Sequence, residues 1–361
     1  MEYKRNYKHV LERLGSFYAG GARDGIFAKM MVVSPTLKEY ERFYPEGDIP
    51  YPDIRDRAVF WDRLLGEQTE LEDDSVPGAY MSEFDGGLYA GLLGSEVRFL
   101  YYPERGWVTS MTAPALADFR DWRKLKLDKD GLWAKRFREQ INYFKEKSNT
   151  KYGIAHFILI DALNLSIELR GGTNMILDVL DYPDELPDYF EFGRELNFWV
   201  WDSFFEIIGL YDGGTVSNYG QWMPGRIVSE SLDPFHMMSL DYFEEWGREN
   251  AEKVFAHYDG GCIHIHQGNG KHLIQPASTI EGIKLIALID EIWNDDKAYM
   301  HMDEYDGLRG DVPVLFTIPH PVFTEMLRKK HLAANCLYNV TNVPDVDTAN
   351  RLMEEVRNYR K

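Results

Sequence analysis

From about residue 152 onward, short runs of apolar and β-branched residues alternate with longer stretches in which apolar residues recur every three or four positions. The short runs predict buried strands, and the longer stretches predict amphipathic helices. We expect strands over residues 155–160, 214–219, 261–266, 283–289, 312–318 and 336–342. We expect helices over residues 187–208, 239–257, 271–280, 296–306, 321–331 and 346–358.

This alternation indicates an α/β protein built from parallel strand–helix units. Two glycine-rich segments, "GGARDG" and "GNGKH", lack the spacing of a dinucleotide or phosphate-binding loop, so no nucleotide cofactor is expected. We therefore predict a closed (β/α)8 TIM barrel with an N-terminal α+β extension. Residues 1–150 would form the extension and the first barrel elements, and 151–361 the main barrel body, within one structural domain.

Composition narrows the class of protein. A hydrophobic fraction of 44% with 14% aromatic residues is sufficient for a large core. The formal charge of −19 argues against a nucleic-acid partner. No segment has the length and apolarity of a signal peptide or membrane span, and the two cysteines form no disulfide framework, so we expect a cytoplasmic protein. The oligomeric state is open, and a homodimer is among the arrangements considered.

In a barrel of this kind the chemistry lies at the carboxyl ends of the strands. The expected strand ends carry several polar side chains, and the segment "VSESLDPFHMMS", read as a loop, adds two acids. The residues selected are Asp161, Asn218, Tyr219, His264, His266, Asp290, Glu291, His320, Thr341 and Asn342 at strand ends, and Glu230 and Asp233 in the loop.

The segment "CIHIHQGNGKHL" concentrates candidate ligands. Side chains alternate between the two faces of a strand, so Cys262, His264 and His266 should point into the barrel while the two isoleucines face the helices. The glycines on either side of Asn269 would allow a ligand to approach the backbone there.

Two imidazoles on one strand face could supply two ligands of a zinc site. The third ligand would be His320, Glu230 or Cys336, and His320 completes the set we select. Both histidines could instead form hydrogen bonds without any metal. The two cysteines are expected to be structural.

Six residues are selected as substrate-binding candidates: Asp161, Asn269 and Asn342 from the segments above, together with Asp85, Arg170 and Tyr219. Asp85 precedes a Gly-Gly pair in an apolar segment, where an unpaired acid is costly. Arg170 could hold a carboxylate through two hydrogen bonds or could form an internal salt bridge. Tyr219 could form part of the pocket wall.

Several segments resemble the uroporphyrinogen decarboxylase-like superfamily. They are "FDGGLYAGLLGSEV", "IELRGGTNMILDVLDYPDELPDYFE", "SESLDPFHMMSLDYFEEW", "HIHQGNGKHL", "VPVLFTIPHPVFTEML" and "LYNVTNVPDVDTANRLMEEV". The resemblance implies a (β/α)8 barrel with an N-terminal extension. It also implies either decarboxylation or zinc-dependent methyl transfer involving corrinoid proteins or thiols. The arginine-rich N-terminal signature of the decarboxylase is absent, which disfavours a porphyrinogen substrate.

The corrinoid-type methyltransferases carry His-x-Cys where this chain has His264 and His266, and a further cysteine where it has Thr341 and Asn342. The resemblance therefore implies a harder zinc site, formed by the two histidines with His320 or Glu230. Such a site suits an oxygen-bearing substrate better than thiol activation.

We accordingly expect a methyltransferase-like enzyme that acts on a small, partly anionic molecule, with a corrinoid protein or thiol as methyl acceptor. His264 and His266 would hold metal or act as acid and base, while Asp233 or Glu230 orients the substrate. Corrinoid would enter only through a partner protein. The alternatives are a decarboxylase of a small acid held by Arg170 or Arg226, and a non-catalytic docking partner of a corrinoid protein.

Overall fold

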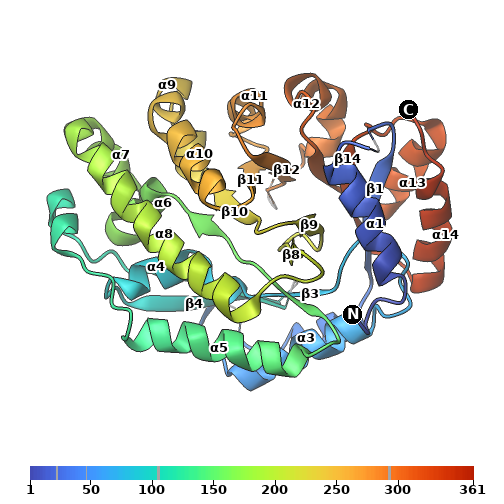
Figure 1. Ribbon diagram of the computed structural model, residues 1–361, viewed down its shortest axis with the longest axis horizontal. Coiled ribbons are helices and arrows are strands. Elements are labelled where there is room, and N and C mark those ends of the chain that lie inside the picture. Colours follow the sequence, from blue (N-terminus) through green and yellow to red (C-terminus); the bar gives the residue numbers. More distant parts are fainter. Residues whose placement is uncertain (22, 46, 104–105, 292–293) are drawn as a thin grey trace.

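A parallel sheet of seven strands organises the protein in the computed structural model, which describes residues 1–21, 23–45, 47–103, 106–291 and 294–361 (Figure 1). The strands lie in the order β1 (Ile26–Val32), β14 (Cys336–Val343), β13 (Val314–Pro319), β12 (Ile283–Ile289), β11 (Gly261–His266), β10 (Val228–Ser231) and β7 (Leu159–Ile160).

Shorter pairings surround this sheet. An antiparallel group contains β2 (Gly47–Ile49), β4 (Val97–Tyr102) and β5 (Trp107–Thr112). Two further pairs are the parallel β3 (Gly78–Tyr80) with β6 (Gly153–Ala155), and the antiparallel hairpin of β8 (Gly214–Val216) with β9 (Trp222–Pro224).

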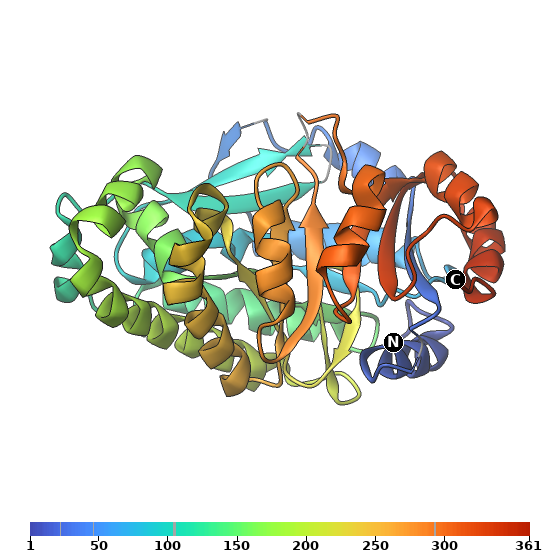
Figure 2. The same cartoon turned by 90° about the horizontal axis from the view of Figure 1, so that it is seen from above.

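Helices follow most of the parallel strands and cover their outer face (Figure 2). The α-helices of the first half are α1 (Tyr7–Tyr18), α2 (Pro35–Tyr40), α3 (Ile54–Gly66), α4 (Gly86–Leu92), α5 (Leu132–Ser148), α6 (Ala162–Arg170) and α7 (Gly172–Asp181). Those of the second half are α8 (Leu186–Ile208), α9 (Leu240–Tyr242), α10 (Arg248–His257), α11 (Ile274–Ser278), α12 (Met302–Leu308), α13 (His320–Lys329) and α14 (Val346–Arg357).

The two faces of the sheet belong to separate apolar clusters. Ile263 and Ile265 of β11 pack into the large cluster that includes the surrounding helices. Cys262 of the same strand belongs to a smaller inner cluster with Leu315 and Leu337. Helix α1 and the β8–β9 hairpin supply much of the remainder of that inner cluster, and Figure 1 shows the hairpin in the middle of the arc of helices. Helix α1 and the hairpin therefore cover the apolar part of the inner face.

The prediction of an α/β fold with parallel strands is confirmed, but the strand pairing does not form a closed ring. The β1 edge is met by side chains of the segment that precedes β3. Asp74 accepts a hydrogen bond from the backbone N–H of Ala28 at 3.1 Å, and Asp73 accepts one from that of Met30 at 2.7 Å. These carboxylates pair backbone groups that a neighbouring strand would otherwise satisfy.

The helices expected beyond residue 186 are present, and the strand predictions at 261–266 and 283–289 match β11 and β12. The prediction of a sheet strand over 214–219 was wrong, because β8 forms the antiparallel hairpin. The strand that lies between β7 and β11 is β10, in a segment predicted to be a loop. Its Ser-Glu-Ser sequence looks solvent-exposed, yet all three residues are buried.

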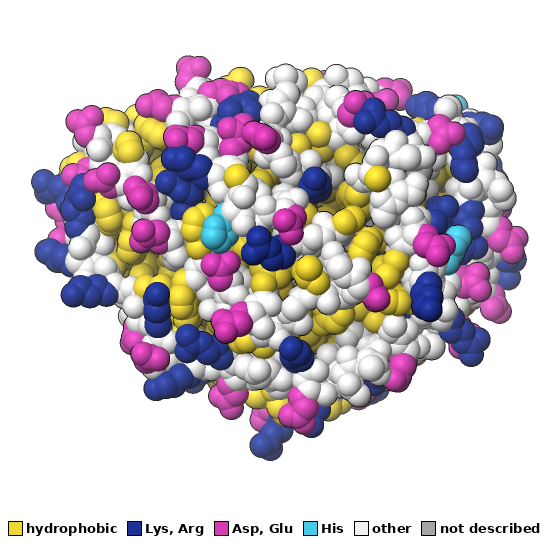
Figure 3. All heavy atoms as spheres, viewed as in Figure 1, with side chains coloured by type: hydrophobic (Ala, Val, Ile, Leu, Met, Phe, Trp, Pro, Cys, Tyr) yellow, Lys and Arg dark blue, Asp and Glu magenta, His cyan; other side chains and the backbone are white. Residues whose placement is uncertain are grey.

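Within the described ranges, no helix is both long and apolar enough to cross a bilayer. Acidic and basic side chains are interspersed over the face in Figure 3, with apolar groups visible between them. Cys262 and Cys336 are free and buried, as predicted for structural cysteines.

Candidate metal and acid–base site

The two histidines of β11 point to the inner face, as period-two geometry predicts. In the parallel register Ser231 of β10 lies beside His264, and Ala287 of β12 lies on its other side. The His264 ring is almost fully buried, whereas the His266 side chain retains 26% of its exposure at the end of the strand. One ring is thus fixed by packing and the other is accessible to solvent.

Asp233 lies within reach of both rings and belongs to the segment that follows the neighbouring strand, β10. It opens the short 3₁₀ helix Asp233–Met237, directly after β10. Its Oδ1 lies 2.9 Å from His264 Nε2 and 3.4 Å from His266 Nε2. Together these residues offer three ligand atoms within 4.8 Å of one another. We refer to Asp233, His264 and His266 as the triad.

Glu291 orients the outer ring of the triad. Its Oε1 lies 2.6 Å from His266 Nδ1, which leaves Nε2 turned toward Asp233. A carboxylate behind a histidine fixes the tautomer and strengthens the ring as a metal ligand. Burial lowers the pKa of His266, but the neighbouring Asp233 and Glu291 offset this and raise it above its ordinary value.

The pKa of Asp233 is set mainly by its burial and by the two imidazoles beside it. Burial alone would raise its pKa, but the two imidazoles hold the pKa of this carboxyl well below its usual value. A third imidazole, that of His236, packs edge-on to His266 with ring centroids 5.4 Å apart. Burial lowers the pKa of His236 to about 4, so this ring stays neutral and adds no positive charge.

The donor set of the triad fits a divalent metal ion. Two imidazole nitrogens and one carboxylate oxygen are ligands that zinc accepts, and catalytic zinc sites combine three protein ligands with one open position. The Asp233 side chain is 40% exposed, so the triad can be reached from solvent. His264 Nδ1 is buried and has no hydrogen-bond partner among the described residues.

Two further acids, Asp161 and Asp85, are buried. Asp161 caps α6 and accepts a hydrogen bond from the Asn164 N–H at 2.7 Å. Burial, with a smaller contribution from the charge of Asp233, raises the pKa of Asp161 to about 7. Asp85 accepts hydrogen bonds from the Tyr80 hydroxyl at 2.7 Å and the Ile158 N–H at 3.1 Å, and burial raises its pKa to about 7.

Two residues selected from the sequence have partners outside the triad, and for Arg170 that partner forms the internal salt bridge left open as its alternative. Glu230 pairs in register with Ile263 and therefore points toward the helices, where its Oε1 accepts a hydrogen bond from Asn250 of α10 at 3.0 Å. Arg170 forms a two-point ion pair with Asp178, at 2.7 and 2.8 Å. Two further N–H groups, both on Nη1, donate to backbone carbonyls, so internal partners occupy four of its five N–H groups.

His320 begins α13 and is not part of the metal-ligand group found among the described residues, so Asp233 takes the place predicted for it. Asn269 and Asn342 are exposed, the first after β11 and the second at the end of β14 with a φ of 58°. Tyr219 lies in the β8–β9 turn, with its hydroxyl 3.4 Å from the Ser229 hydroxyl. A substrate-binding role for these three stays a prediction.

Two neighbours of the triad were given no role from the sequence. Glu291 was noted only as a strand end, and His236 was not selected at all. The sequence did contain a signal for His236, since it follows Asp233 by three residues. The 3₁₀ turn brings His236 Nδ1 to 3.8 Å from Asp233 Oδ1.

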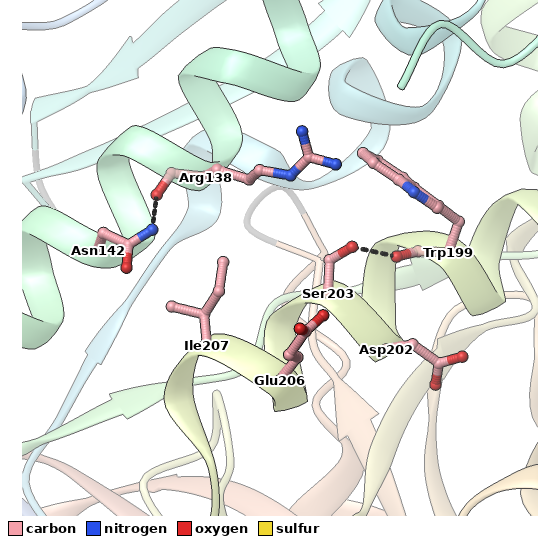
Figure 4. Close-up of a pocket in the computed structure, with 7 residues that line it drawn as sticks. All are labelled: Arg138, Asn142, Trp199, Asp202, Ser203, Glu206 and Ile207. Carbon is pink, nitrogen blue, oxygen red and sulfur yellow. Dashed lines mark hydrogen bonds between the residues drawn. The ribbon is translucent and has the colours of Figure 1, made fainter. Parts of the chain in front are cut away.

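A surface pocket of about 640 Å³ lies between α5 and α8, away from the triad (Figure 4). The Arg138 guanidinium lies 5.2 Å from the centre of the Trp199 ring at its rim. Its lining combines both signs of charge with polar groups, so the pocket has no reactive constellation comparable to the triad.

No protein-family model and no curated protein sequence matches the chain. Among solved structures, a methyltransferase from Methanosarcina mazei is similar over 97% of this chain and 98% of its own, with a TM-score of 0.60 and 11% sequence identity. At that identity the likeness concerns the fold.

Proposed function

We propose that this protein is a metal-dependent methyltransferase in which Asp233, His264 and His266 hold a zinc ion. The observation that carries the proposal is the meeting of Asp233 Oδ1 with Nε2 of both imidazoles, at 2.9 and 3.4 Å, at the carboxyl end of a parallel sheet. The full-length likeness to the Methanosarcina mazei methyltransferase supports it. We also take the sheet and the β3–β6 pair, with β6 and β7 as two parts of one interrupted strand, as one (β/α)8 barrel of the uroporphyrinogen decarboxylase-like superfamily.

The substrate would be a small molecule with a methyl group on oxygen or nitrogen, and the acceptor a corrinoid protein or a thiol. In the transfer the heteroatom keeps the electrons of the broken bond and gains a proton, while an electron pair of the acceptor forms the new bond to the methyl carbon. When bound, zinc supplies the Lewis acidity that stabilises the heteroatom as it loses the methyl group. A ligand set without thiolate suits this role.

The surrounding residues would support the triad. Glu291 holds the His266 ring so that Nε2 faces Asp233. Asp161, whose pKa is raised to about 7 mainly by burial, stays largely uncharged below neutral pH and so does not add a second negative charge beside Asp233.

Metal binding is tested by purifying the protein without chelator and measuring zinc by mass spectrometry. We expect about one equivalent in the wild type and less than a tenth in Asp233→Asn and His264→Ala, since each loses one of three ligands. Glu230→Gln is the matched control, because Glu230 is a neighbouring buried acid that points away from the triad. Less than a tenth of an equivalent in the wild type, before and after dialysis against zinc, would contradict the metal site.

Methyl transfer is tested with a panel of deuterated O-methyl, N-methyl and S-methyl compounds, using reduced cobalamin or a thiol as acceptor. We expect label in the acceptor with the wild type and none with His264→Ala. A zinc-loaded protein that transfers methyl from no donor would contradict the function. Release of carbon dioxide from small acids instead would favour the decarboxylase.

A further inference from the structure

A row of three hydrogen-bond donors crosses the inner face of the sheet on the strands farthest from the triad. Lys29 of β1 pairs in register with Asn339 of β14, which pairs in turn with Thr317 of β13. The residues two positions earlier on the latter two strands, Leu337 and Leu315, belong to the inner cluster. Because alternate residues share a face, the row points to the same inner face.

The row lies level with the outer part of the triad. Backbone pairing sets His264 beside Ala287 of β12, and Ala287 beside Leu315 of β13. Two residues further along each strand, His266 lies beside Ile289, and Thr317 takes the corresponding position on β13. A ligand on the inner face could therefore reach the row at one end and His266 at the other.

The donors of the row are largely unused. The Lys29 ammonium makes one hydrogen bond, a long one of 3.4 Å to the Tyr219 carbonyl, and no ion pair within the described ranges. Asn339 and Thr317 form no side-chain hydrogen bond with any described residue. All three residues remain partly accessible, so a ligand could reach them. The row therefore offers donors that the described part of the protein leaves largely unused.

The charges around β1 leave Lys29 without a counter-ion. Asp73 is paired with the buried Lys4 and also accepts from the Met30 N–H. Asp74 is paired with Arg13 at 2.7 Å. Lys4 and Arg13 are neutralised by Asp73 and Asp74, so the charge of Lys29 remains as one excess positive charge. Burial, the largest influence, lowers the pKa of Lys29, and the charge of Asp73, which is itself paired with Lys4, offsets this only in part.

We infer that Lys29, Asn339 and Thr317 form a subsite for the carboxylate of the methyl-donor substrate. This inference rests on the proposed function and identifies the substrate class as small methylated monocarboxylates. One excess positive charge matches one carboxylate, whose two oxygens can accept from the ammonium and from the amide or hydroxyl. A phosphate dianion would need more positive charge, and the carboxylates of Asp233 and Glu291 at this end of the sheet disfavour it.

The turn of the β8–β9 hairpin shapes the subsite. Gly220 has a φ of +76°, and a Cβ there would lie 2.6 Å from Lys29 Nζ. Glycine therefore permits both the left-handed turn and the close approach of the ammonium to the Tyr219 carbonyl. The backbone holds the ammonium in place without neutralising it.

The test compares 3-methoxybenzoate with 3-methoxybenzamide, which have nearly the same shape but differ in charge, by titration calorimetry on the full chain. We expect the wild type to bind the acid at least about tenfold more tightly than the amide. Lys29→Met should reduce this preference to less than about twofold, whereas Lys29→Arg keeps part of it. Thr317→Val should lower it about threefold. Lys253→Met, which removes an exposed lysine of α10, is the matched control and should change nothing.

Equal binding of the two probes by the wild type, binding of neither, or an undiminished preference in Lys29→Met would overturn the subsite. If Lys29→Met does not fold, Lys29→Arg and Thr317→Val decide, because loss of the preference only in the valine variant would place the anion away from Lys29. Asp233→Asn separates this inference from the proposed function. Asp233→Asn should lose zinc and methyl transfer but keep the acid preference, because the subsite is independent of the triad. Acid preference in a wild type that binds no zinc and transfers no methyl group would leave the subsite standing and refute the methyltransferase proposal.

Discussion

Two successive levels of the same sheet face differ sharply in character. At the lower level, Leu315 and Leu337 lie in the inner cluster under α1 and the β8–β9 hairpin and exclude water. Two residues further along the same strands, the side chains are Thr317 and Asn339, level with His266. One step of the period-two repeat thus separates packing from chemistry. Changes at the lower level should cost stability, and changes at the upper level should cost function.

The largest expected effect is at the upper level. His264→Ala removes a triad ligand that is held against Asp233, and we expect methyl transfer to fall by about a thousandfold or more. Transfer kinetics with a fixed donor measure the loss, and urea unfolding should show a much smaller change in the free energy of unfolding. A variant that unfolds but keeps its specific activity per folded molecule would reverse the assigned roles of the two levels.

Asp85 tests whether a buried acid of this protein stays uncharged because of its burial. Its pKa is about 7 in the folded protein against an ordinary value of 3.8, so the folded state binds the proton more tightly. Its contribution to the free energy of unfolding therefore falls as pH rises from about 4 to 7, by at most about 4 kcal/mol, and is level above that.

Asp85→Asn should remove this part of the pH dependence. Urea unfolding of the wild type and the variant at pH 5 and pH 8 gives the difference, and the wild type should lose more stability over that interval. Other acids with raised pKa values, including Asp161, contribute alike to both proteins and cancel. Parallel stability curves would mean that Asp85 is ionised when folded.

At the lower level, Leu337→Ala should reduce the free energy of unfolding by about 3 kcal/mol, because it removes a fully buried side chain and leaves a cavity. Chemical denaturation measures this loss, and zinc content per folded molecule should be unchanged. A variant that is stable but cannot bind zinc would show that the two levels are coupled.

The smallest effect is expected from Glu291→Gln. This substitution keeps the size of the side chain but weakens the hydrogen bond that orients His266, so zinc affinity should fall about tenfold. Competition with a zinc chelator measures the affinity. Glu304→Gln, at an exposed acid of α12 paired with Lys271, is the control. Equal zinc affinity of wild type and Glu291→Gln would remove the supporting role of Glu291.

Local pattern was enough to predict part of the candidate site. The alternation in "CIHIH" orients both imidazoles correctly, because period two is a property of the strand itself and β11 is buried on both faces. The choice among the acids that follow could not be made in this way. Glu230 and Asp233 lie three residues apart, and only the register of β10 against β11 turns one toward α10 and leaves the other beside the rings.

Other features could not be predicted, because they depend on contacts between segments that are distant in the sequence. The pairing of Arg170 with Asp178 requires the angle between α6 and α7, and periodicity does not encode that angle. Strand β10 was missed because its serines and glutamate are polar, and their burial depends on partners such as Asn250 of α10. Lys29 gave no signal within its own strand, since its lack of a counter-ion follows from the Lys4–Asp73 and Arg13–Asp74 pairs.

The β8–β9 turn has an evolutionary consequence. The turn consists of five residues, Ser217 to Gln221, and lies against the inner face of the sheet. The Lys29 ammonium donates to the Tyr219 carbonyl of this turn and not to a residue of a sheet strand. A longer or shorter turn would change the depth of the space available to a ligand, while the hydrogen bonds of the sheet would stay the same. Proteins that share this sheet could therefore change the size of molecule they accept by altering one short turn.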